Sequence, residues 1–177
     1  MKVTVEELTE GILWLCVGGE GTLERDVKEL REGLLREVDK DLALGELFLL
    51  RISLAAYAVQ RFLTPAVQQQ ARMAFSRGVH AILTDSEDKE VMGDPNKMID
   101  GMNERYRQYL EAIQAPHHLG PPWNVGNVFA TLCGEERNLR VVMAAANEFA
   151  GALVAVREFL KKCKGMDGGD VVNLPEE

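Results

Sequence analysis

Cysteine and histidine are scarce in this chain of 177 residues, which contains three of each. The cysteines, Cys16, Cys133 and Cys163, are odd in number and none has Cys-x-x-Cys spacing. This pattern is typical of free thiols in a reducing compartment and argues against a disulfide framework. No histidine follows a glutamate by three residues, which excludes the Glu-x-x-His ligands of di-iron helical bundles. We therefore expect no metal site and no cofactor.

An excess of basic residues is also lacking. The chain has 20 lysines and arginines against 28 aspartates and glutamates, giving a net charge of -8. Proteins that bind nucleic acid use a basic face to neutralise phosphates, and basic segments also hold proteins on anionic membranes. The charge balance argues against both partners and is compatible with a basic protein partner.

No long uncharged hydrophobic run is present. Residues 42–63 form the longest apolar stretch, but three charged side chains interrupt it, which a membrane span rarely tolerates. Near the N-terminus, the apolar residues 11–18 follow three glutamates, whereas a signal peptide has basic residues at that place. We expect a cytosolic protein that does not insert into a membrane.

Complete catalytic motifs are missing too. The sequence has no phosphate-binding Gly-x-x-x-x-Gly-Lys loop, no Gly-x-Ser-x-Gly elbow and no His-Glu-x-x-His pair. Nor does it contain a convincing run of alternating polar and apolar residues of the kind that predicts strands. What remains points to helices and does not identify a reaction.

Helical signals fill the chain instead. Thr4 and Glu7 have the spacing of a capping box, Thr64-Pro65 is a typical helix start, and Asn124 after Trp123 is expected to cap a short helix. We predict an all-α fold: a single-domain bundle of about six helices. The predicted parts are one domain over residues 1–164, a buried central helix near 42–63, a long C-terminal helix near 135–163, and a flexible tail at 165–177.

The stretch AIQAPHHLGPPWNVG, residues 112–126, carries two of the three histidines. His117 and His118 follow a predicted helix end, where an imidazole interacts favourably with the helix dipole, and three nearby prolines stiffen the connection. We interpret the pair as part of a joint between two helices. Metal binding and general acid/base catalysis by one histidine stay open as alternatives.

Two hypotheses for function follow, and elimination favours the first. It is a non-catalytic acidic helical module that binds a protein partner, as a regulator, adaptor or immunity-type inhibitor does. The acidic segment near residues 84–90 is the predicted contact surface. Its carboxylates are Asp85, Glu87, Asp88 and Glu90.

The second hypothesis is a small-ligand-binding protein or an enzyme with a pocket between helices. The polar and aromatic side chains that such a pocket would use are His80, Arg105, Tyr106, His117, His118 and Trp123.

The C-terminal helix also suggests a homodimer. Apolar residues recur every three or four positions from Leu139 to Cys163, and many small residues lie beside them. Small side chains let a second helix approach closely. That helix is either residues 42–63 of the same chain or the same helix of a second copy, and we expect the dimer.

Overall fold

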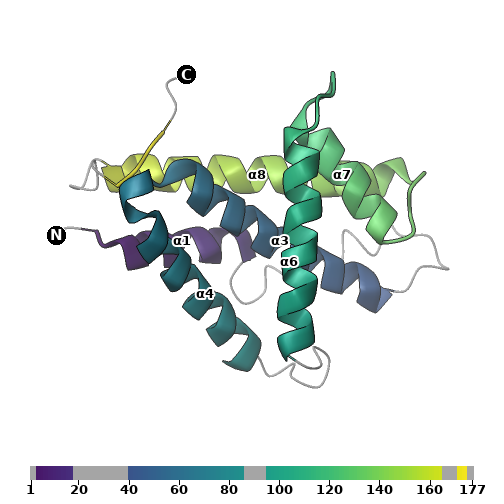
Figure 1. Ribbon diagram of the computed structural model, residues 1–177. Helices are drawn as coiled ribbons and strands as arrows, with labels where there is room; N and C mark the ends of the chain where they lie inside the picture. Colours follow the sequence, from purple (N-terminus) through teal and green to yellow (C-terminus); the bar gives the residue numbers. More distant parts are fainter. Residues whose placement is uncertain (1–2, 18–39, 86–94, 165–170, 175–177) are drawn as a thin grey trace.

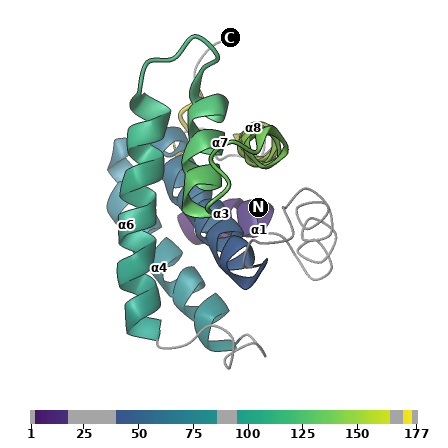
Figure 2. The ribbon, with the colours of Figure 1, turned by 90° about the vertical axis from the view of Figure 1, so that its right-hand side faces the viewer.

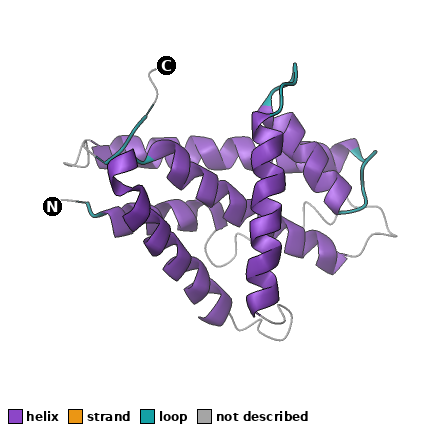
Figure 3. Ribbon diagram, in the orientation of Figure 1, coloured by secondary structure: helices purple, strands orange, loops and turns teal. Residues whose placement is uncertain are grey.

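The computed structural model describes residues 3–17, 40–85, 95–164 and 171–174 (Figure 1). Within these ranges the regular structure is helical, and no strand is formed (Figure 3). This confirms the predicted all-α bundle. The elements are α1 (Val5–Val17), α3 (Lys40–Phe62), the 3₁₀ turn η1 (Pro65–Val67), α4 (Gln68–Asp85), α6 (Pro95–Gln114), α7 (Pro121–Leu132) and α8 (Leu139–Cys163).

The start of α1 is held by the capping box that the sequence predicts. The Glu7 amide donates to Thr4 Oγ1 at 3.2 Å, and the Thr4 amide donates to Glu7 Oε2 at 2.8 Å. Both bonds satisfy amides that have no partner within the helix. The bonds from Thr4 lower the pKa of the Glu7 carboxyl.

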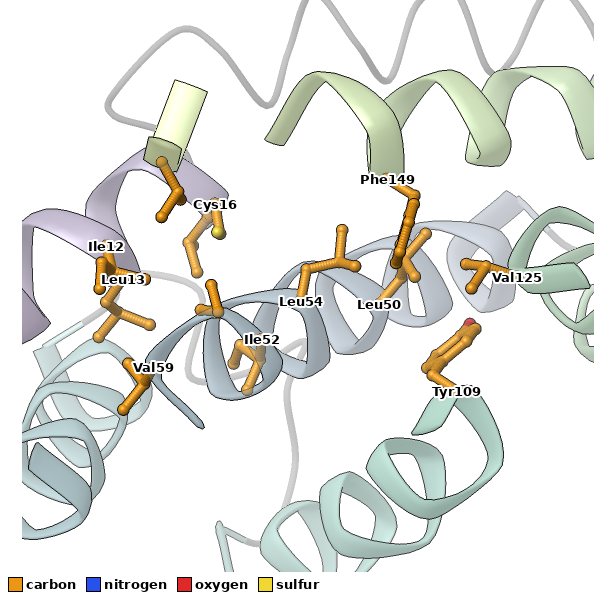
Figure 4. Close-up of a cluster of buried hydrophobic side chains, with 14 of the residues drawn as sticks. Ile12, Leu13, Cys16, Leu50, Ile52, Leu54, Val59, Tyr109, Val125 and Phe149 are labelled. Carbon is orange, nitrogen blue, oxygen red and sulfur yellow. The ribbon is translucent and has the colours of Figure 1, made fainter. Parts of the chain in front are cut away.

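Helix α3 is the centre of the bundle, as its composition predicts. It packs against each of the other five α-helices in the part of the chain that the structure describes. Figure 4 shows its side chains Leu50, Ile52, Leu54 and Val59 among residues from α1, α6, α7 and α8. A helix that is apolar nearly all round can be stable only where neighbours cover every face.

Two charged residues of α3 are buried in this core, and each has a partner on another helix. Arg51 Nε donates to Glu148 of α8 at 2.6 Å, and the Arg51 side chain is 2% exposed. Glu46 accepts from Arg105 of α6 at 2.6–2.9 Å through both carboxylate oxygens. These pairs explain how an apolar core helix carries charge, because a buried ion needs a compensating partner.

The connection between α6 and α7 differs from the prediction. Helix α7 begins at Pro121, with Gly120 as the preceding residue at a φ of 78°, so Asn124 is not its cap. Prolines are favoured in a first turn, where no amide bond is lost. The Asn124 side-chain amide instead donates to the carbonyls of Ala112 and Ala115 at 3.0 and 2.9 Å, which ties α7 to the end of α6.

Helix α8 begins four residues later than the predicted start near 135. Asn138 caps it by accepting from the Arg140 amide at 3.1 Å. Glu135 is buried in the preceding connection and accepts from the Asn138 side chain at 2.8 Å. An apolar seam of α8 packs inside the chain, against α7, α1 and α3, so it is not the contact with a second copy that its pattern suggested. Its buried members are Val142, Ala146, Phe149, Val156, Leu160 and Cys163.

Residues 171–174 lie within the segment expected to be a flexible tail, and they pair with the end of α3. Thr64 donates its amide to Val171 at 3.0 Å, and the Asn173 amide donates to the Phe62 carbonyl at 2.7 Å. Val172 is buried against the core and forms an isolated bridge with Leu63. The end of α3 offers backbone groups without helical partners, and this segment pairs with them. Residues 165–170 and 175–177 are outside the described part.

Candidate functional site

The acidic segment predicted as a contact surface cannot be compared with the structure. Glu87, Asp88 and Glu90 lie outside the described residues. Asp85 is the last residue of α4, and its side chain also lies outside the described part. The acidic contact surface therefore stays a prediction.

The two adjacent histidines lie in the exposed turn between α6 and α7. Their rings stack with centroids 4.3 Å apart, and the ring of Trp123 is 6.5 Å from that of His117. His117 Nδ1 accepts from the Leu119 amide at 3.1 Å. Among the described residues, no group of three or more His, Cys, Asp or Glu side chains is placed to hold a metal ion. The two imidazole rings thus contact each other and the ring of Trp123 within an exposed connection between α6 and α7.

The six side chains considered for a ligand pocket occupy three places. His117, His118 and Trp123 meet at the α6–α7 joint. Arg105 and Tyr106 are neighbours on α6, but Arg105 bonds to Glu46 while the Tyr106 hydroxyl donates to Gln60 at 2.6 Å.

The third place is α4, where His80 is exposed and its backbone carbonyl accepts from the Thr84 hydroxyl at 2.9 Å. A cleft lies between α3, α4 and α6, and Tyr106 is the one member of the predicted set that lines it. The structure thus divides this set among separate elements.

A buried polar cluster surrounds the Glu46–Arg105 pair. The sequence pattern did not predict this cluster. Tyr109 is 1% exposed, and its hydroxyl has no hydrogen-bond partner among the described residues. Burial, together with the charge of Glu46, raises the pKa of Tyr109 well above its usual value. The same two causes, with Glu135, raise the pKa of Cys133 to about 12. Both groups stay protonated at neutral pH, which suits a structural role.

The thiols are poor nucleophiles. Burial raises the pKa of Cys16 to about 12, aided by the charge of Glu148, and burial alone raises the pKa of Cys163. All three cysteines are buried and free. Because the thiolate is the reactive form, so little of it at neutral pH leaves these residues inert.

We expect the native protein to resist alkylation by iodoacetamide at about pH 8, because burial covers each thiol and raises its pKa. Intact-protein mass spectrometry should show no addition to the folded chain and three additions after denaturation. Rapid modification of the folded chain at any one cysteine would contradict the burial described for that residue.

The outward-facing side of α8 exposes several apolar side chains. Figure 2 views this helix nearly end-on at the edge of the bundle, opposite α6. Three large apolar side chains are exposed along it: Leu139 (59%), Met143 (44%) and Val154 (62%). We call this surface the outer strip. Its exposed, uncharged members are Leu139, Met143, Ala144, Asn147, Ala150, Gly151 and Val154.

Charged residues flank the outer strip at both ends. Arg140 lies at its start, and its guanidinium has no ion-pair partner among the described residues. Glu158 lies 18 residues further on and accepts from Lys161 at 3.0 Å. Since 18 residues make five full turns, Arg140 and Glu158 lie on the same flank of α8, about 27 Å apart. Arg140 and Glu158 thus mark the two ends of the outer strip, with Lys161 beside Glu158.

Both α3 and α8 are long and apolar enough to cross a membrane by length and composition alone. The tested stretch of α3 is 67% buried within the bundle, which is typical of a core helix, while that of α8 is 33% buried. Comparison with protein-family models, curated proteins and solved structures gave no significant match to this chain.

Proposed function

We propose that this protein is a non-catalytic helical module that acts by binding another protein, and that its first partner is a second copy of itself. The observation that carries the proposal is the outer strip of α8, an exposed apolar surface without charge. Such surfaces on otherwise polar proteins are typical of protein–protein contacts. A role as a regulator, adaptor or immunity-type inhibitor fits this activity, and the net charge of -8 with three free thiols favours the cytosol.

The charges of Arg140 and Glu158 favour a second copy of the chain as the partner that covers the outer strip. If two α8 helices pack antiparallel about a two-fold axis, Arg140 of each copy faces Glu158 of the other, because both lie on the same flank and are equally far from the axis. The axis then passes near Ala150 and Gly151, whose size allows the helices to approach closely. This is the self-complementary pattern that two-fold interfaces require.

Apolar burial supplies the affinity in this arrangement, and the ion pairs set its direction. Exposed ion pairs contribute about 0–1 kcal/mol each, whereas complete burial of a valine or leucine side chain contributes about 1.5–3 kcal/mol. Each of Leu139, Met143 and Val154 is buried twice in a symmetric dimer, once in each copy.

Val154→Glu is the direct test. We expect the wild-type chain to sediment as a dimer at micromolar concentration, and the variant to dissociate with a Kd raised at least about 100-fold, since each dimer loses two buried valines and gains two unpaired charges. Met73→Glu is the matched control, because Met73 is 52% exposed on α4 and lies outside the strip. A wild-type chain that is only monomeric would refute the proposal.

Charge reversal tests the antiparallel direction separately. Arg140→Glu and Glu158→Arg should each weaken the dimer about tenfold, because each places two pairs of like charges together. The chain that carries both substitutions should recover the wild-type Kd. If the double variant is weaker than either single variant, Arg140 does not face Glu158 and the packing direction is wrong.

A further inference from the structure

A cleft with a volume of about 390 Å³ lies between α3, α4 and α6. Of these helices, α6 lies on the side of the bundle opposite α8, while α3 is central (Figure 2). Four apolar side chains form much of its wall: Ala56 and Val59 from α3, Phe75 from α4 and Leu110 from α6. Its volume lies within the range of sites that bind small molecules.

The geometry of the cleft is held by hydrogen bonds between the helices. The Gln68 side-chain amide donates to the carbonyls of Val59, Gln60 and Leu63 at 3.3, 3.1 and 2.8 Å, which fixes the start of α4 to the end of α3. The Tyr106 hydroxyl donates to Gln60 Oε1 at 2.6 Å and joins α6 to α3. A cleft whose walls are fixed in this way loses little entropy when it binds a ligand.

One charged residue lines the cleft, and it is positive. Arg72 of α4 has no hydrogen-bond or ion-pair partner among the described residues, and no carboxylate is found in the lining. Burial raises the pKa of Tyr106 although Arg72 acts in the opposite direction, so the phenol stays a neutral donor to Gln60. The Gln60 side chain then has its amide nitrogen left to donate, beside the five N–H groups of Arg72.

We propose that this cleft binds a small carboxylate with an apolar body, the carboxylate on Arg72 and the body against Val59, Phe75 and Leu110. A planar guanidinium pairs with a carboxylate through two parallel hydrogen bonds. The single arginine favours a monocarboxylate over a phosphate, which needs more donors, and the apolar walls favour a molecule with hydrocarbon or an aromatic ring. This activity goes beyond the proposed protein binding and uses a separate surface.

The test is isothermal titration calorimetry at neutral pH with octanoate and phenylpropionate, each compared with its uncharged alcohol. We expect at least one acid to bind about threefold to fivefold more tightly than its alcohol, because Arg72 is exposed and an ion pair with an exposed group is weak. The aliphatic and aromatic probes show which kind of body the walls accept. The proposal would be overturned if neither acid binds at concentrations up to the aqueous solubility of octanol, the least soluble of the probes.

Two variants assign the binding to this cleft. Arg72→Met should abolish the preference for acid over alcohol while the alcohol still binds, because the apolar walls are unchanged. Ala56→Leu should weaken both probes about equally by filling the cleft. Arg137→Met is the control, since Arg137 is an exposed arginine in the connection between α7 and α8 and does not line the cleft. A preference for acid that survives Arg72→Met, or is lost in Arg137→Met, would refute the assignment.

Discussion

Arg105→Met is expected to lower the free energy of unfolding by about 3–5 kcal/mol. Arg105 gives Glu46 three hydrogen bonds at 2.6–2.9 Å, and the Glu46 side chain is 4% exposed. Without the guanidinium, a carboxylate is left in the core between α3 and α6 with no opposite charge beside it. Such an ion keeps its desolvation cost and loses the attraction that offset that cost.

Chemical denaturation of three variants separates this cause from simple loss of packing. The double variant Glu46→Met with Arg105→Met should recover most of the lost stability, because replacing a whole buried ion pair by apolar residues is often neutral. Arg107→Met is the matched control on the same helix: Arg107 pairs with Glu104 and Glu111 in solvent, so its loss should cost less than about 1 kcal/mol. A double variant less stable than Arg105→Met would show that the pair acts through shape and not through charge.

Gly126→Ala should destabilise the chain by about 3 kcal/mol or more. Gly126 is the point at which α7 crosses α8, and a methyl group there would collide with the Val142 carbonyl oxygen and lie 3.1 Å from Val142 Cγ1. The obstacle is helix backbone, which cannot rotate away as a flexible side chain does. The two helices must therefore separate, and the contacts around Val125 and Phe129 loosen with them.

Gly101→Ala provides the control for this prediction. Gly101 lies within α6, and a methyl group there meets no atom within 4 Å. Alanine is the better helix former by about 1 kcal/mol, so this variant should be stabilised while Gly126→Ala is destabilised. Thermal unfolding of both proteins measures the difference, and destabilisation of similar size in both would contradict the close crossing of α7 and α8.

Helix boundaries show where the sequence was sufficient and where it was not. The start of α1 was predicted correctly because Thr4 and Glu7 cap through contacts three residues apart. Asn124 also has the character of a cap, yet its side-chain amide donates to the carbonyls of Ala112 and Ala115 at the end of the preceding helix. Both Thr4 and Asn124 are residue types that often cap helices. They differ because a second helix lies beside Asn124, and a local sequence pattern does not show where a second helix lies.

The candidate sites were less predictable than the fold. The ligand set proposed from residue type divides among separate elements, because aromatic and basic side chains that are close in sequence turn to different sides of a helix. No feature of the sequence around Arg72, the charged residue of the cleft, marks it as part of a site. Glu46 and Arg51 are marked, because a charge within an apolar run must either be exposed or have a partner. Their partners lie 59 and 97 residues away, so the sequence does not identify them.

The sequence by itself determined that the chain is helical, that residues 42–63 form the buried centre, and which segments are amphipathic, because these properties depend on neighbours within two turns. Only the tertiary structure decided which side of α8 packs inside and which stays outside, that Val172 returns to the end of α3, and that three helices leave a cleft beside Arg72. Those outcomes depend on how helices that are far apart in sequence cross. A crossing is set by how the side-chain surfaces of the two helices fit together, and the sequence of one helix does not specify the surface of the other.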